Sequence, residues 1–214
     1  MTDTTTDPRP AAAPPTPTGP SIPTRRVSFA DRLDGLPRHF AQDGNLILSH
    51  FAAALSTVFA EGELFLLAAV RQARGQLDDP RLQREVAGFI GQEAVHGREH
   101  RAFNEHLTTL GYPTERFRRV VHGYMHLQGR RRPEVRLAHT AASEHITAVL
   151  AEALLADDRA ADSFGPVAGD VCRWHALEEL EHKTVAFDVY RATGGSERQR
   201  IRSAREMRWS LAVA

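Results

Sequence analysis

Apolar side chains recur at intervals of three and four residues through four long stretches of the chain. This spacing places them on one face of an α-helix, which would turn toward a core. Asn45 can cap the first helix and Pro80 can begin the second. The predicted helices span about residues 45–75, 80–110, 133–157 and 165–193. No stretch alternates with the period of two that is typical of a strand, so the pattern predicts an all-α protein.

The connections between these helices differ in length. Those after the first and third predicted helices are short, whereas residues 111–132 can cross over the molecule and hold a short helix of their own. Two helical hairpins joined by one long crossover form the topology of a ferritin-like four-helix bundle. For the arginines of the crossover a solvated surface is the favoured role, with a phosphate or carboxylate contact as the alternative. They are Arg116, Arg118, Arg119, Arg130, Arg131 and Arg132.

A carboxylate interrupts the apolar stripe of each predicted helix. Four converging carboxylates without partners would repel one another and take up protons, because burial of a charge is unfavourable. Two of them are followed three residues later by a histidine, and residues three apart on a helix share a face. Two cations would neutralise the carboxylates, and the two imidazoles would complete their coordination. The predicted ligands are Glu63, Glu93, His96, Glu144, Glu179 and His182.

The order of these residues is informative. One glutamate from each of two helices, with Glu-x-x-His from each of the other two, is the pattern of ferritin-like di-iron and di-manganese proteins. A single Glu-x-x-His motif is common by chance on a solvated helix, but four carboxylates within apolar stripes are not explained in that way. Periodicity leaves one choice open, because Glu61 also lies in an apolar row and competes with Glu63.

Three further histidines lie near these motifs. His175 precedes the last Glu-x-x-His motif by four residues, and His100 follows the histidine of the first by four, so each shares a face with a predicted ligand. His145 adjoins the glutamate of the third helix but is rotated from it by about 100°. For His100 and His145 we favour a hydrogen-bonded position beside the site over direct ligation.

Charge and cysteine content narrow the classes of function. Lys and Arg together number 27, as do Asp and Glu, so charge does not indicate a nucleic-acid partner. The single cysteine, Cys172, excludes an intramolecular disulfide and a Cys-based zinc module, and it favours a reducing, cytoplasmic location. A small core residue is the favoured role for this thiol.

The ends of the chain differ from its centre in composition. Residues 1–25 are rich in Pro, Thr and Ala and lack the apolar region of a secretory signal, so we expect a disordered tail. The longest clean apolar run, Leu64–Val70, is too short to span a membrane, and no membrane partner is predicted. The predicted metal-binding domain covers residues 26–195, and a C-terminal helical segment covers residues 196–214.

Four segments resemble the bacterial family of predicted metal-dependent hydrolases, a family that we identify as ferritin-like. They are FAEGELF (59–65), REVAGFIGQEAVHGREHRAFN (84–104), ASEHITA (142–148) and WHALEELEHKTVAFDVY (174–190). In that family the first helix carries a motif similar to F-P-x-G-E, which implies Glu63 as the ligand, although Ala60 replaces the proline here. Members usually continue beyond the last residue of this chain, so a truncated C-terminal segment is one interpretation of residues 196–214.

A narrower resemblance concerns the last predicted helix. The motif His175-x-x-x-Glu179-x-x-His182 is similar to that of the di-iron arylamine N-oxygenases, which add a third histidine to the usual two. This resemblance implies that His175 is a seventh ligand.

The ligand types favour one reaction over two others. Carboxylates are hard donors that stabilise oxidised iron, so we expect two metal ions and an O2-activating oxidase or oxygenase. Iron is the favoured metal and manganese is the alternative, because ligand type alone does not separate the two. Its partners would be O2, a small organic substrate, an external electron donor of unknown identity and a second copy in a homodimer. The family resemblance implies a two-metal hydrolase as the runner-up. The third hypothesis is a ferroxidase, an iron-storage protein or a protein with a structural metal.

The apolar side chains nearest these motifs could form a dry pocket around the metals. The candidates are Phe59, Leu66, Phe89 and Phe103, with ordinary core packing as the alternative for each.

Overall fold

The computed structural model describes residues 22–213, and none of these residues is in a strand. The helices are α1 (Leu46–Ala73), α2 (Pro80–Thr109), α3 (Thr114–Gly129), α4 (Pro133–Leu155), α5 (Asp158–Asp162), α6 (Pro166–His182), α7 (Val185–Ala192) and α8 (Glu197–Val213). The all-α prediction is confirmed.

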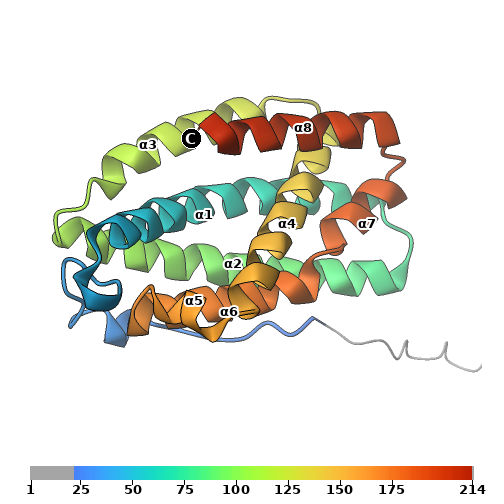
Figure 1. The fold of residues 1–214 in the computed structure, drawn as a ribbon. Helices are drawn as coiled ribbons and strands as arrows, with labels where there is room; N and C mark the ends of the chain where they lie inside the picture. Colours follow the sequence, from blue (N-terminus) through green and yellow to red (C-terminus); the bar gives the residue numbers. More distant parts are fainter. Residues whose placement is uncertain (1–21, 214) are drawn as a thin grey trace, which may run out of the picture.

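The interior lies between the helices that the sequence predicts to be longest. Helices α1 and α2 pack against each other along their length, and α4 crosses α1 to pack on α6, α7 and α8 (Figure 1). Helix α3 covers α1 from outside, and α8 packs on the outer side of α4. The enclosed volume is therefore bounded by α1, α2, α4 and the α6–α7 segment.

Local sequence sets the starts of these helices. The side chain of Asn45 accepts a hydrogen bond from the Leu48 backbone N–H at 3.0 Å, and Asp79 caps α2 in the same manner, directly before Pro80. Gly165, which precedes α6, has a φ of +83°, and a Cβ there would collide with the backbone oxygen of Phe40. Only glycine fits this position without strain.

Two segments differ from the predicted elements. The crossover is almost wholly helical, because α3 fills residues 114–129. The fourth predicted helix is interrupted at Lys183 and Thr184, directly after His182. Thr184 and Val185 are β-branched and weaken a helix, but periodicity did not reveal the break because the apolar row continues in phase into α7.

The N-terminal boundary also differs. The predicted disordered tail lies outside the described residues as far as residue 21, whereas residues 22–25 contact α2 and α6. We call residues 22–29 the N-terminal strap. It runs along α2 and α6, and its last residue, Phe29, is buried (Figure 1).

Helix α1 has one further property. Leu46–Gln76 is long and apolar enough to cross a membrane by length and composition, which the short run at Leu64–Val70 did not suggest. However, 56% of its most apolar window is buried inside the protein, as in the central helix of a helical core.

Candidate metal centre

Four glutamates from four helices meet in the interior. Glu63 comes from α1, Glu93 from α2, Glu144 from α4 and Glu179 from α6, and each is at most 4% exposed. We call these four residues, together with His96, His175 and His182, the carboxylate cluster. Burial of four carboxylates in one place requires a source of positive charge nearby.

The histidines lie between the glutamates. His182 has its Nε2 atom 3.1 Å from Glu93 Oε1 and its Nδ1 atom 3.0 Å from Glu144 Oε2. The Nε2 atom of His175 lies 2.9 Å from Glu179 Oε1 and 3.7 Å from Glu63 Oε1. Each of these two rings therefore joins carboxylates from two different helices.

His96 is placed differently from the other two histidines. Its Nδ1 atom faces Glu93 Oε1 at 3.5 Å and Glu179 Oε1 at 4.0 Å. Its Nε2 atom instead lies 2.9 Å from Oε2 of Glu178, a glutamate outside the cluster. The ring thus turns one nitrogen toward the cluster and the other away from it.

The carboxylates do not share one protonation state. Burial raises the pKa of Glu63 well above its usual range, and the charge of Glu93 raises it further. Burial likewise raises the pKa of Glu144 to about 8. Burial opposes ionisation of Glu93 too, but His182 and His96 outweigh it and hold the pKa of Glu93 below its usual range.

The charge of the imidazoles follows from the same contacts. Burial acts to lower the pKa of His96, but Glu178 and Glu93 beside it raise that pKa to about 10. The pKa of His182 is also raised despite burial, by Glu144 and Glu93. Two protonated imidazoles therefore supply part of the positive charge that the carboxylates require.

Several donor atoms in the cluster still lack a partner. Within the described part of the chain, no hydrogen bond reaches either carboxylate oxygen of Glu63 or Glu93, nor Oε1 of Glu144, Oε2 of Glu179, Nδ1 of His96 and Nε2 of His182. Buried polar atoms are almost always hydrogen-bonded, so a group of orphaned atoms that face one another indicates a ligand-binding site.

These atoms fit metal ions in type and spacing. Carboxylate oxygens and imidazole nitrogens are ligands of iron, manganese and zinc. Two groups of donor atoms, one of which takes in His100 beside the cluster and neither of which includes Glu144, have members that all lie within 4.8 Å of one another. The first group is Glu93, His96, Glu179 and His182, and the second is Glu63, His100 and His175. The cluster is therefore suitable for two metal ions.

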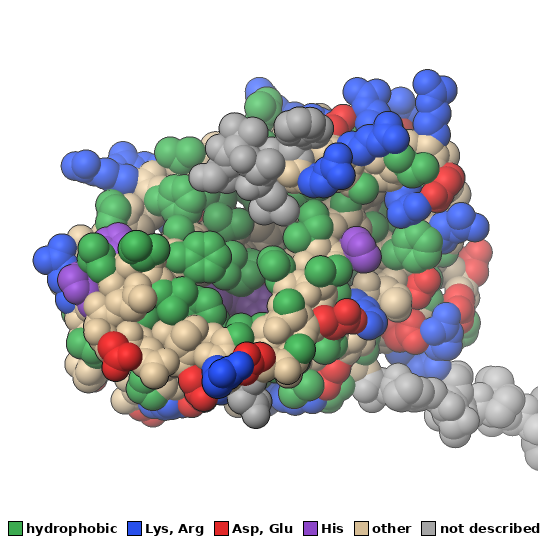
Figure 2. Space-filling model, in the orientation of Figure 1, with side chains coloured by type: hydrophobic (Ala, Val, Ile, Leu, Met, Phe, Trp, Pro, Cys, Tyr) green, Lys and Arg blue, Asp and Glu red, His purple; other side chains and the backbone are tan. Residues whose placement is uncertain are grey.

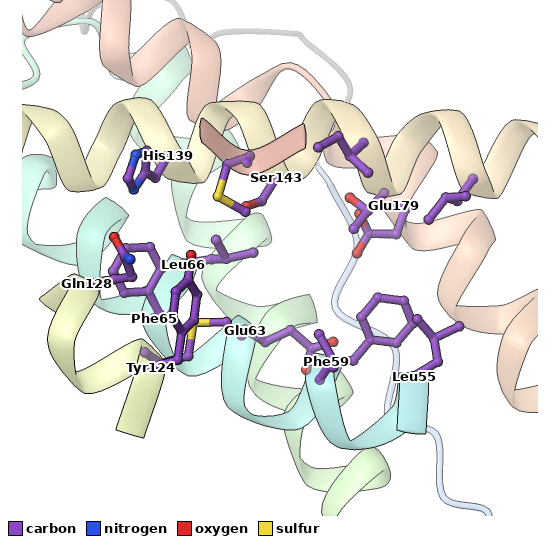
Figure 3. A pocket seen from close by; sticks show the side chains of 17 residues that line it. Leu55, Phe59, Glu63, Phe65, Leu66, Tyr124, Gln128, His139, Ser143 and Glu179 are labelled. Atoms are coloured by element: carbon purple, nitrogen blue, oxygen red, sulfur yellow. The ribbon is translucent and has the colours of Figure 1, made fainter. Parts of the chain in front are cut away.

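An apolar cavity opens onto the cluster. Its volume is about 130 Å³, and Glu63 and Glu179 reach into it from opposite walls (Figure 3). An adjoining cavity of about 190 Å³ shares Phe59 and Glu179 with the first and reaches His175. Figure 2 shows the hollow from outside, with hydrophobic walls and histidine at its floor. Other apolar lining residues are Leu55, Val58, Phe65, Leu66, Met125, Ile146 and Leu150.

The sequence pattern of a family described as predicted metal-dependent hydrolases matches residues 23–214. The chain belongs to this family. The match includes the N-terminal strap from residue 23 and the whole of α8, so the family domain extends on both sides of the predicted range 26–195. No curated protein and no solved structure shows significant similarity to the chain.

Glu63 and Glu61, the two candidate glutamates of the first predicted helix, have different surroundings. In this member of the predicted metal-dependent hydrolase family, Glu63 lies in the carboxylate cluster. Glu61 is also buried, but it faces α3, where it accepts hydrogen bonds from Arg118 at 3.3 Å and from His122 Nδ1 at 2.8 Å. Arg118 of the crossover therefore contacts a buried carboxylate. Such a contact was the alternative to a solvated surface for the arginines of this segment.

The three extra histidines have different positions. His175 lies within the cluster, and its Nδ1 atom is 2.7 Å from His100 Nε2. The Nδ1 atom of His100 is in turn 2.9 Å from Ser56 Oγ, so His100 contacts the cluster through His175. His145 is exposed and lines a separate cavity between α4, α7 and α8, so the position predicted for it beside the site is wrong.

Not all of the expected pocket residues line the cavity. Phe59 and Leu66 do. Phe89 and Phe103 are instead buried in the apolar core, where Phe89 also meets the ring of His182 edge-on with centroids 5.0 Å apart. For Phe89 and Phe103, core packing, the alternative to a place in the pocket wall, is therefore correct. Cys172 lines the second cavity, and burial raises the pKa of its thiol to about 12, so it is not a nucleophile at neutral pH.

Sequence reasoning missed two residues beside the cluster, Glu178 and Arg25. Glu178 accepts a hydrogen bond from Arg25 at 3.0 Å and contacts His96 with its other oxygen. Glu178 directly precedes the predicted ligand Glu179, and on a helix adjacent residues point about 100° apart. Arg25 lies 153 positions from Glu178 in the chain. Neither periodicity nor spacing carries a signal for such a pair.

Proposed function

We propose that the protein is an enzyme with a dinuclear metal centre in a ferritin-like helical bundle. The proposed ligands are Glu63, Glu93, His96, Glu144, His175, Glu179 and His182. The observation that carries this proposal is the convergence of four buried carboxylates, one from each of four helices, with oxygen atoms that have no hydrogen-bond partner in the described chain. Two cations would supply the charge that these carboxylates need.

The arrangement of the helices supports the ferritin-like part of the proposal. Helices α1 and α2 form one antiparallel pair, and α4 with the α6–α7 segment forms the other. Helix α3 occupies the crossover between the pairs. Two such pairs, joined by one long connection around an acidic centre, are what this class of bundle requires.

The hydrogen bonds of His175 support its assignment as a ligand. If Nε2 of His175 binds a metal, Nδ1 must carry the proton and donate a hydrogen bond to Nε2 of His100. His100 then carries its own proton on Nδ1 and donates to Ser56 Oγ. Burial lowers the pKa of both His175 and His100, which favours the neutral rings that this relay needs.

For the reaction, we propose oxidation of a small organic substrate by O2. Two iron ions, when bound, would supply the O2 chemistry, with an external electron donor where the reaction requires one. The chain would contribute a dry, apolar cavity beside the metals, walled by residues such as Phe59, Leu66 and Leu150. Such walls favour an apolar substrate and limit the access of water to the centre.

Hydrolysis is the second candidate, and the family description is the observation that favours it. A two-metal centre can lower the pKa of a bound water and stabilise the oxygen that is displaced from the substrate. Burial raises the pKa of the Cys172 thiol to about 12, so this side chain of the second cavity is not an activated nucleophile. In this candidate the nucleophile would be a water bound to the metals.

One experiment separates the two candidates. The metal-free protein is loaded with Fe(II) without oxygen, the metals per chain are counted, and absorption is followed after exposure to O2. We expect two irons per chain and a transient band that depends on oxygen. Two bound metals without any reaction toward O2 would instead favour hydrolysis. A Glu61→Ala variant serves as the control, because it removes a buried carboxylate outside the cluster.

A further inference from the structure

The N-terminal strap lies close against α2. A Cβ atom on Gly88 would come within 2.6 Å of the backbone oxygen of Ile22, and one on Gly91 would collide with the side chain of Thr24. The two glycines are three residues apart and share one face of the helix. The strap is fixed further by Gln92, whose Nε2 atom donates to the Pro23 oxygen at 3.0 Å. This face of α2 is therefore shaped to receive the strap.

The strap places the positively charged side chain of Arg25 on the side of His96 that faces away from the carboxylate cluster. Arg25 forms a two-pronged contact with Glu181, at 2.7 Å and 2.6 Å, and its Nη1 atom also donates to Glu178 Oε1 at 3.0 Å. The side chain of Glu178 is fully buried, and its other oxygen lies 2.9 Å from Nε2 of His96. Arg25, Glu178 and His96 thus form a continuous chain of contacts from the strap to the cluster.

A second route connects the strap with the same histidine. The ring of Phe29 packs on Trp174 with centroids 5.6 Å apart, and Trp174 meets His96 edge-on at 4.8 Å. The backbone N–H of Phe29 donates to Glu99 Oε2 at 2.9 Å, which anchors the end of the strap on α2. The orientation of the His96 ring is therefore constrained from two sides.

We infer that Arg25 and Glu178 are positioning residues that hold His96 in the form and orientation that bind metal. A carboxylate only accepts hydrogen bonds, so Glu178 requires the proton of His96 on Nε2. In the neutral ring that metal binding requires, the lone pair is then on Nδ1, which faces Glu93 and Glu179. Partners of this kind orient metal-bound histidines and increase their basicity. The inference rests on the proposed function, because it assigns a role relative to the metal.

The two Glu-x-x-His motifs differ in this respect. His182 has Glu144, a proposed ligand from α4, at 3.0 Å from its Nδ1 atom. The second contact of His96 is Glu178 on α6, and Glu178 is in turn held by Arg25 of the strap. Loss of the strap contact should therefore disturb His96 and leave the contacts of His182 unchanged.

The test is titration of the full-length, metal-free protein with Co(II), whose visible absorption reports the coordination of the metal. We expect Arg25→Ala and Glu178→Gln to bind the metal at His96 about 10- to 100-fold more weakly and to change the Co(II) spectrum. Arg25→Lys should recover part of the affinity, because it restores the charge but not the two-pronged contact. Arg26→Ala is the matched control, since Arg26 is exposed beside Arg25, and its affinity should equal that of the wild type.

The remaining outcomes distinguish this inference from the proposed function. If the wild type binds no Co(II), the proposed function fails and the inference fails with it. If the wild type binds two ions and both Arg25→Ala and Glu178→Gln match its affinity and spectrum, only the inference is overturned. Thermal unfolding of the metal-free variants should stay within about 4 °C of the wild type. Loss of the fold in both variants would also overturn it, because the pair would then be structural.

Discussion

Two regions of the interior are buried to the same degree but are built from opposite chemistry. At one end, α1, α2, α4 and α7 enclose an apolar cluster; its members include Val70, Leu82, Val86, Phe89, Leu137, Val185, Val189 and Tyr190. Toward the other end, α1, α2, α4 and α6 enclose the carboxylate cluster. Burial stabilises the first region without any added component, whereas in the second it desolvates charges that repel one another.

The two regions therefore have different roles: the apolar cluster stabilises the fold, and the carboxylate cluster is positioned by it. The apolar cluster can stabilise the helices before any metal is bound, so the carboxylates can be held close together in the metal-free protein. We therefore expect changes in one region to affect stability and changes in the other to affect metal content. The following variants test that division.

The largest effect is expected from removal of a central carboxylate. Glu93→Ala or Glu179→Ala should abolish metal binding, because each residue contributes donor atoms to the main group of four. Metal per chain, measured after loading and desalting, provides the check. Glu61→Ala removes a glutamate that is equally buried but faces α3, and it should retain both metals. Two metals in the Glu93→Ala protein would refute the site assignment.

A truncation in the apolar cluster should have the opposite signature. Leu137→Ala creates a cavity at a position that is 3% exposed and should lower the free energy of unfolding by about 2–5 kcal/mol. Its metal content should stay unchanged. The matched control is Leu127→Ala, where the side chain is 60% exposed and the change should be within about 0.5 kcal/mol. Urea unfolding measures the free energy of unfolding, and metal per chain after loading and desalting measures the metal content.

Metal should stabilise the wild type and fail to stabilise a variant of the carboxylate cluster. With free metal at about 100 times its dissociation constant, one site contributes about 2.7 kcal/mol to the free energy of unfolding. A chelator should reverse the gain. Leu137→Ala should gain as much as the wild type, and Glu93→Ala should gain nothing. An equal gain in Glu93→Ala would mean that the metal acts elsewhere on the chain.

The smallest effect concerns the pH dependence of the metal-free protein. The folded pKa of Glu144 is raised to about 8, so the folded state holds this proton more tightly than the unfolded state. Stability from this group is therefore present at low pH and is lost as the pH rises from the usual carboxyl range to about 8, with a slope of at most about 1.4 kcal/mol per pH unit. Glu144→Gln should reduce that slope. An unchanged slope between about pH 5 and 8 would show that Glu144 titrates normally.

The helices and the acidic centre were accessible from sequence because both depend on periodicity. The rows that contain Leu137 and Val189 identify buried faces, and glutamates within such rows must be buried as well. The same reasoning did not choose between Glu61 and Glu63, because both lie in apolar rows and only the packing of α3 separates them. It also missed the break after His182, where the apolar row continues in phase across the interruption.

The periodicity of apolar residues did not predict contacts between segments that are distant in the chain. Arg25 was assigned to a disordered tail because the composition around it is rich in proline, yet it contacts Glu178 on α6. His145 was expected near the centre because it adjoins Glu144, but a rotation of about 100° places it on another cavity. Sequence spacing fixes positions along one helix, and the partner across the interior depends on how the helices pack.

The most direct test of the central claim is anomalous diffraction from crystals of the protein loaded with iron or manganese. We predict two anomalous peaks about 3.5–4 Å apart, the separation usual for two-metal centres, among Glu63, Glu93, Glu144 and Glu179. Peaks outside the carboxylate cluster, or none in protein that was exposed to excess metal, would contradict the account.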